Sequence, residues 1–183
     1  MLIGCLGWGS LVWDPRELPV HGQWFEDGPF LPIEFARQSQ DGRLTLVILP
    51  DGPSVRTLWT LFSVPTLSEA REALRQRENI PMAKSAEHIR AWPTADGCES
   101  KPQEIGAWAR RVGLDAVAWT ALPPKFEDKD GRVPTVQEAV SYLHDLFHEK
   151  RRHAEEYIRR APRQVDTPYR RRFEREFGWK PVP

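Results

Sequence analysis

Hydrophobic and polar residues in the first third of the chain recur with the short period of β-strands. A short apolar run covers residues 2–6, and an alternating run follows at residues 31–36. Gln40-Asp41-Gly42 is a turn signal, so residues 43–49 are expected to form the hairpin partner of 31–36. Residues 55–64 (VRTLWTLFSV) are rich in β-branched and aromatic side chains, which favours a central strand. The pattern therefore predicts four early strands.

The period then changes to that of helices. Thr66-Leu-Ser-Glu69 is a capping box, which predicts a helix from there to about residue 78 with Asn79 as its stop. A second helix is predicted at about residues 103–112. Residues 116–122 are apolar almost throughout, which is typical of a strand buried on both faces.

The C-terminal third is predicted to be helical. Thr135 and Glu138 form another capping box, which predicts one long amphipathic helix to about residue 160. Thr167 and Pro168 indicate the N-cap and first residue of a last short helix. Strands followed by helices predict an α+β fold or a mixed β-barrel with helices packed outside. The apolar stripe of the long helix is Val136, Ala139, Val140, Leu143, Leu146 and Phe147.

Length and charge exclude several classes of protein. The 183 residues correspond to about one domain. With 26 basic and 26 acidic side chains the net charge is zero, which argues against a general nucleic-acid binder. No apolar run approaches the roughly 20 residues of a membrane span, and the N-terminus lacks the pattern of a signal peptide. Cys5 and Cys98 form neither a disulfide framework nor a zinc motif, so we expect no metal and a cytoplasmic protein with Cys5 buried and reduced.

The first candidate site is the loop Gly7-Trp8-Gly9-Ser10-Leu11, directly after the first strand. Glycines at alternate positions allow a sharp turn that exposes successive N–H groups to an anion. The spacing G-x-x-G-x-G differs from the dinucleotide-binding fingerprint. The residues leave two interpretations open, a tight exit from the strand and an anion-binding loop.

The second candidate is Glu78. At about 100° per residue from Leu67, Leu74 falls at about −20° and Glu78 at about +20°, so Glu78 continues an apolar stripe. It also lies at the predicted helix C-terminus, where the macrodipole disfavours an anion. A carboxylate that breaks two local rules is typical of a functional site, and partial burial suits it to proton transfer. The alternative is a surface side chain paired to Arg71 or Arg75.

The third candidate is the arginine-rich tail. Residues 148–175 contain ten Lys and Arg and five Asp and Glu, which leaves a local charge of +5. One interpretation is a solvated helix face with i,i+4 ion pairs. The other is a surface that binds an acidic partner or nucleic acid.

Taken together, these motifs resemble the gamma-glutamylcyclotransferase family, especially its ChaC-type branch that acts on glutathione. That branch opens with a strand and a Y-G-S-L-[IV]-W motif, which matches residues 8–13 (WGSLVW) here. Further along it has a central strand and a short helix that ends in L-x-x-R-E, which matches residues 74–78 (LRQRE). The resemblance covers roughly residues 2–80, with residues 116–122 as a last shared strand.

The resemblance implies both a fold and a reaction. The fold is a small mixed β-barrel with flanking helices and one pocket. Gly9, Ser10 and Leu11 would hold the α-carboxylate and α-amino end of a γ-glutamyl group. Glu78 would accept a proton from the substrate's α-ammonium, the freed amine would attack the γ-carbonyl, and the same carboxyl would protonate the leaving amine. The products would be 5-oxoproline and an amine, amino acid or peptide, without a cofactor.

The chain departs from the family pattern at two places. Trp8 stands where the motif has Tyr, and an extra segment follows Glu78. We therefore predict a cyclotransferase-like barrel domain at residues 1–125 with an insertion at about 80–113. Residues 126–183 are predicted to be a helical extension packed on the same domain.

Two functional alternatives come with these departures. One is a non-catalytic module that binds or senses a small ligand on the same fold. The other is an interaction protein that uses the arginine-rich helices. The expected partner is a small γ-glutamyl substrate. We expect the protein to bind neither a membrane nor, under the main interpretation, nucleic acid. The C-terminal helices could form a homodimer.

Overall fold

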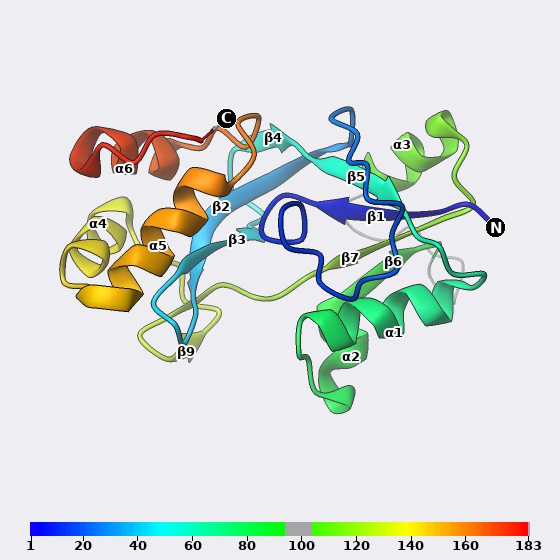
Figure 1. Ribbon diagram of the computed structural model, residues 1–183, viewed down its shortest axis with the longest axis horizontal. Helices are drawn as coiled ribbons and strands as arrows, with labels where there is room; N and C mark the ends of the chain where they lie inside the picture. Colours follow the sequence, from blue (N-terminus) through cyan, green and yellow to red (C-terminus); the bar gives the residue numbers. More distant parts are fainter. Residues whose placement is uncertain (94–103, 183) are drawn as a thin grey trace. The chain divides into compact units, whose positions relative to one another are not determined.

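The structure, a computed structural model, describes residues 1–93 and 104–182. It has two compact units that interleave along the chain, and each is described by itself. The first consists of Met1–Gly7, Asp14–Leu31 and Arg56–Leu122, and the second of Trp8–Trp13, Pro32–Val55 and Pro123–Pro183. The described strands form two mixed sheets with helices around them (Figure 1). The predicted α+β class is confirmed, whereas the closed barrel and the boundary at residue 125 stay predictions.

The first unit contains a four-stranded sheet in the order β5-β1-β7-β6. Strand β1 pairs parallel with β7 and antiparallel with β5, and β6 pairs antiparallel with β7. All four strands are short. Their bounds are β1 Ile3–Gly7, β5 Leu58–Leu61, β6 Ile89–Trp92 and β7 Ala116–Thr120.

The two faces of this sheet carry different side chains. One face has a row of small residues in register, and the other has large aromatic residues. Helix α3 (Glu104–Val112) lies on the aromatic face, where the rings of Trp59 and Trp108 are 5.4 Å apart. Helix α1 (Leu67–Arg77) packs on β6 and β7, and Figure 1 shows it on the other side of the sheet from α3. The small row is Thr60, Cys5, Ala118 and Ala91.

The predicted insertion contains two short helical elements before β6. They are the 3-10 turn η1 (Met82–Lys84) and the single-turn helix α2 (Ser85–His88). The predicted helix at 103–112 corresponds to α3, and its first predicted residue lies outside the described residues, as does Cys98.

The second unit contains the sheet β3-β2-β8-β9, with β4 also paired to β2. The predicted hairpin is confirmed as β2 and β3, with a bulge between Phe35 and Arg37. Helix α5 packs on β3, and α4 packs against α6. The bounds are β2 Phe30–Gln38, β3 Leu44–Ile48, β4 Ser54–Arg56, β8 Lys125–Phe126, β9 Lys129–Asp130, α4 Val136–His144, α5 His148–Arg160 and α6 Pro168–Phe177.

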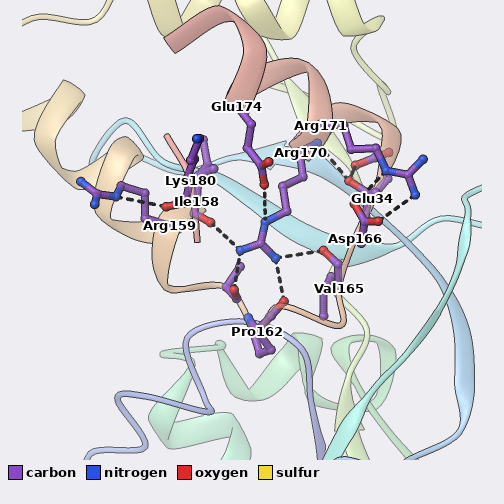
Figure 2. A network of polar contacts seen from close by, with 12 residues as sticks. Glu34, Ile158, Arg159, Pro162, Val165, Asp166, Arg170, Arg171, Glu174 and Lys180 are labelled. Carbon is purple, nitrogen blue, oxygen red and sulfur yellow. Dashed lines mark hydrogen bonds and ion pairs between the residues drawn. The ribbon is translucent and has the colours of Figure 1, made fainter. Parts of the chain in front are cut away.

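Arg170 joins α6 to the end of α5 (Figure 2). Its side chain is 1% exposed, and its two terminal nitrogens donate to four backbone carbonyls. Two of these carbonyls lie at the C-terminus of α5, where the helix leaves its last acceptors unpaired. A guanidinium with five donors can satisfy such a set at once. The four acceptors are Ile158, Ala161, Pro162 and Val165.

Two predicted elements are wrong. Residues 55–64 do not form one strand, because Thr57 separates β4 from β5 and the two strands join different sheets. The N–H and hydroxyl of Thr57 both donate to the Pro29 carbonyl, at 3.1 and 2.8 Å. The long helix at 135–160 is interrupted between α4 and α5, where His148 has a φ of 47°. Phe147, predicted to be buried, is 74% exposed.

Candidate functional site

Glu78 is the C-cap residue of α1, and backbone hydrogen bonds at the end of the helix fix its position. Its N–H donates to the Leu74 carbonyl at 3.0 Å. The N–H groups of Asn79 and Ile80 bond back to the Gln76 and Arg75 carbonyls, which is the Schellman arrangement. Asn79 has a φ of 52°, as expected for the residue that stops a helix there. The predicted capping box and stop are confirmed, and together they place Glu78 at the end of the helix.

The carboxylate of Glu78 is held by its neighbour in sequence. Arg77 Nη1 lies 2.8 Å from Glu78 Oε1, and Arg77 Nη2 donates to the Asp14 carbonyl at 2.5 Å. The two side chains are 5% and 18% exposed, whereas that of Glu72 on the same helix is 38% exposed. The predicted inward orientation of Glu78 is therefore confirmed, and a buried guanidinium balances its charge.

Cys5, on the small face of the first sheet, interacts electrostatically with Glu78. Burial raises the pKa of the Cys5 thiol, and the negative charge of Glu78 raises it further, while Arg77 lowers it. Cys5 is thus a neutral, buried thiol within electrostatic range of the carboxylate. Thr60 pairs with Cys5 in the register and shares its face, and its hydroxyl has no hydrogen-bond partner among the described residues.

The glycine-containing loop belongs to the second unit from Trp8 onward. Trp8 is buried, and its indole nitrogen donates to the Leu46 carbonyl of β3 at 3.3 Å. The Val12 N–H donates to the Gly9 carbonyl at 3.0 Å, which closes a turn, and Leu11 is buried. Ser10 lies within this turn and is partly exposed.

Gly9 is required for space. Neither Gly7 nor Gly9 is among the described glycines with positive φ, so the loop does not depend on left-handed backbone at either position. A Cβ added to Gly9 would instead lie 2.5 Å from the Tyr157 hydroxyl oxygen. The sequence suggested a glycine needed for a sharp turn, and the structure gives close packing against α5 as the reason.

The predicted site residues divide between the two units. Gly7 ends β1 in the unit that contains Glu78, whereas Trp8, Gly9, Ser10 and Leu11 belong to the other. Sequence analysis did not single out Arg77, Thr60 or Tyr157. Arg77 could have been found within the L-x-x-R-E match, but the other two offer no local signal.

The described residues show no group of three or more His, Cys, Asp or Glu placed to hold a metal ion. Over the same ranges, no helix combines the length and the apolar character needed to cross a membrane.

Comparison with known proteins supports the fold. No family model matches the sequence, and no curated protein sequence matches it. A similar solved structure is that of a gamma-glutamyl cyclotransferase specific to glutathione, from yeast. The alignment covers 97% of this chain and 98% of the yeast chain, with a TM-score of 0.51 and 14% identity. The chain therefore has an α+β fold similar to that of a gamma-glutamyl cyclotransferase.

Proposed function

We propose that this protein is a cyclotransferase that releases 5-oxoproline from a small γ-glutamyl substrate. The observation that carries the proposal is the carboxylate of Glu78, held by a buried arginine at the end of α1. It is supported by the likeness of the fold to the yeast enzyme and by the WGSLVW and LRQRE motifs.

In the proposed reaction Glu78 carries protons from the substrate's amine to the leaving amine. Its carboxylate accepts a proton from the substrate's α-ammonium group, and the freed amine attacks the γ-carbonyl carbon of the same molecule. A new C–N bond closes the five-membered ring, and the Glu78 carboxyl gives its proton to the leaving amine as the original γ-amide C–N bond breaks. The ring nitrogen then loses a second proton through the regenerated carboxylate to the released amine, which departs as an ammonium ion and leaves 5-oxoproline with one N–H. Because the attack is intramolecular, the protein chiefly has to fix the substrate's geometry.

The loop from Trp8 to Leu11 is proposed to bind the α-carboxylate end of the substrate through its backbone N–H groups. The leaving group would contact other parts of the site, and its identity decides whether the substrate is glutathione or another γ-glutamyl compound.

The experiment is an assay for 5-oxoproline with glutathione, γ-glutamylalanine and γ-glutamylmethylamide as substrates. Glu78→Gln removes the proton acceptor but keeps the shape, so we expect kcat to fall by about 10²- to 10⁴-fold. Glu72→Gln is the matched control, since Glu72 lies on the same helix and also pairs with an arginine. It should leave kcat unchanged, and equal losses in the two variants would reject the role of Glu78.

A binding module is the second candidate, and Trp8 is the observation that favours it. Its indole lacks the hydroxyl of the family's Tyr, and its N–H is already used by the Leu46 carbonyl. If no compound releases 5-oxoproline but glutathione binds in calorimetry, the protein is a binding module.

A further inference from the structure

The outer edge of strand β3 is covered by side chains. β3 is the last strand in the order β3-β2-β8-β9, so among the described residues one of its edges has no neighbouring strand. At Leu46 the N–H contacts the Tyr157 hydroxyl at 3.2 Å, and the carbonyl accepts from the Trp8 indole at 3.3 Å. A tyrosine from α5 and a tryptophan from the loop therefore take the positions that a strand would occupy.

Tyr157 also contacts the loop directly. It is 5% exposed, and its hydroxyl oxygen lies where a side chain on Gly9 would begin. Its ring meets that of Trp13 edge-on, with centroids 5.4 Å apart. One side chain of α5 thus packs against the loop at Gly9 and at Trp13, while its hydroxyl is fixed by β3.

We propose that Tyr157 is a positioning residue for the substrate loop, residues 8–13. This rests on the proposed function, in which backbone N–H groups of the loop bind the α-carboxylate of the γ-glutamyl group. Such groups have to be held within about 0.5 Å of their working positions, which requires a rigid support. The hydroxyl of Tyr157 sets how closely the loop approaches α5, and Gly9 is glycine because this hydroxyl occupies the space of a side chain. The C-terminal helices are then part of the site.

The proposal predicts that the effects of substitutions at Gly9 and Tyr157 are not additive. Packing of the tyrosine ring alone would not produce this coupling. An added methyl group at Gly9 would lie 2.5 Å from the tyrosine oxygen but 3.5 Å from the ring carbon that bears it. Removing only the oxygen therefore makes room for the methyl group. Tyr157→Phe should rescue Gly9→Ala.

The experiment compares the wild type, Tyr157→Phe, Gly9→Ala and the double variant in the 5-oxoproline assay, with the γ-glutamyl compound that the wild type turns over. Tyr157→Phe should raise KM by about tenfold, equivalent to one weakened contact, with kcat nearly unchanged. Gly9→Ala should raise KM further, and the double variant should return to the KM of Tyr157→Phe. Tyr142→Phe is the matched control, because it removes a tyrosine hydroxyl of α4 that donates to the Gly42 carbonyl. Its KM should equal that of the wild type.

The outcomes separate the two proposals. A wild type that releases no 5-oxoproline from any compound overturns the proposed function, and the positioning role falls with it. An active wild type whose KM is the same in Tyr157→Phe overturns the positioning role alone. Simple additivity of the Gly9→Ala and Tyr157→Phe effects on KM would overturn it as well. If Gly9→Ala does not fold, the KM of Tyr157→Phe decides.

Discussion

Arg77 is the more buried member of the ion pair with Glu78, and it holds two parts of the first unit together. One of its terminal nitrogens contacts the Glu78 carboxylate, and the other donates to the Asp14 carbonyl. The Asp14 carbonyl fixes the Arg77 guanidinium, and the guanidinium in turn fixes the Glu78 carboxylate. The position of the carboxylate is therefore set by this contact as well as by its own helix. In the proposed reaction a proton acceptor has to stay within hydrogen-bond reach of the substrate amine.

Replacing Arg77 should impair turnover more than binding. In Arg77→Gln the carboxylate loses its charged partner and its fixed orientation, so we expect kcat to fall by about tenfold or more. KM should change little, because Arg77 does not belong to the substrate loop. Arg71→Gln is the control, since Arg71 lies on the same helix as Arg77 and also donates to a backbone carbonyl, that of Ile89. A kcat for Arg77→Gln equal to that of this control would contradict the role.

Glu34 is a buried carboxylate whose charge should make stability depend on pH. Burial raises its pKa above the ordinary value of 4.5, while hydrogen bonds from Thr167, Phe35 and Tyr169 lower it in part. Between 4.5 and the raised value the folded chain binds more protons than the unfolded chain. The free energy of unfolding should therefore fall as pH rises through this range, and the loss is complete above the folded pKa.

Glu34→Gln should remove this part of the pH dependence. Urea unfolding at a series of pH values from about 4 to 8 should show the variant gaining stability relative to the wild type as pH rises. A constant difference between the two proteins at every pH would show that Glu34 does not titrate differently on folding.

Helix α6 is tied to two other elements by its first turn. Thr167 is its N-cap, accepting from the Arg170 N–H and donating to the Glu34 carboxylate of β2 at 2.5 Å. Arg170, three residues later, closes the C-terminus of α5 (Figure 2). The first turn of α6 thus donates hydrogen bonds both to the last carbonyls of α5 and to the buried carboxylate of Glu34.

Arg170→Met should destabilise the protein strongly. The apolar chain fills the space but removes the guanidinium donor from the carbonyls of Ile158, Ala161 and Val165, while the Pro162 carbonyl keeps the Val165 N–H. The loss should cost about 3 kcal/mol or more of the free energy of unfolding. Arg171→Met, at the next position, removes only an ion pair between half-exposed side chains and should leave stability nearly unchanged. Chemical denaturation measures both, and similar losses would contradict the role of Arg170.

The elements with local signals could be predicted from the sequence, and those set by distant contacts could not. Capping boxes and a left-handed stop placed α1 correctly, and with it the inward orientation of Glu78. The break at Thr57 depends on the Pro29 carbonyl 28 residues away. The break between α4 and α5 has neither proline nor glycine, and Arg151 satisfies the Leu143 carbonyl there from the next helix. Tyr157 was missed for the same reason, since its contacts with Leu46 and Gly9 span most of the chain.

At the scale of the whole chain, most arginines of the tail have partners within the protein. Arg170 is buried, and Arg151 donates to a carbonyl and lies over the rings of Phe177 and Trp179. Four further arginines pair with acidic side chains. These pairs are Arg159–Glu155, Arg160–Glu156, Arg171–Asp166 and Arg172–Glu176.

We therefore predict that the protein does not bind nucleic acid. Fluorescence anisotropy with a single-stranded and a duplex oligonucleotide at low salt should show no binding. An affinity that falls steeply as salt is added would contradict this and would support the interaction protein considered from the sequence.

The contact between Gly9 and Tyr157 joins residues 148 positions apart in the chain. A ribosome makes the chain from its N-terminus, so the loop emerges long before the helix that supports it. Until α5 has been made, Gly9 has no tyrosine beside it, and at Leu46 of β3 the N–H lacks the Tyr157 hydroxyl while the carbonyl still accepts from the Trp8 indole. A chain that ends early would carry Glu78 and the whole glycine loop, yet the loop would lack its support. Under the proposed function, such a chain would bind its γ-glutamyl substrate more weakly than a chain in which α5 is present.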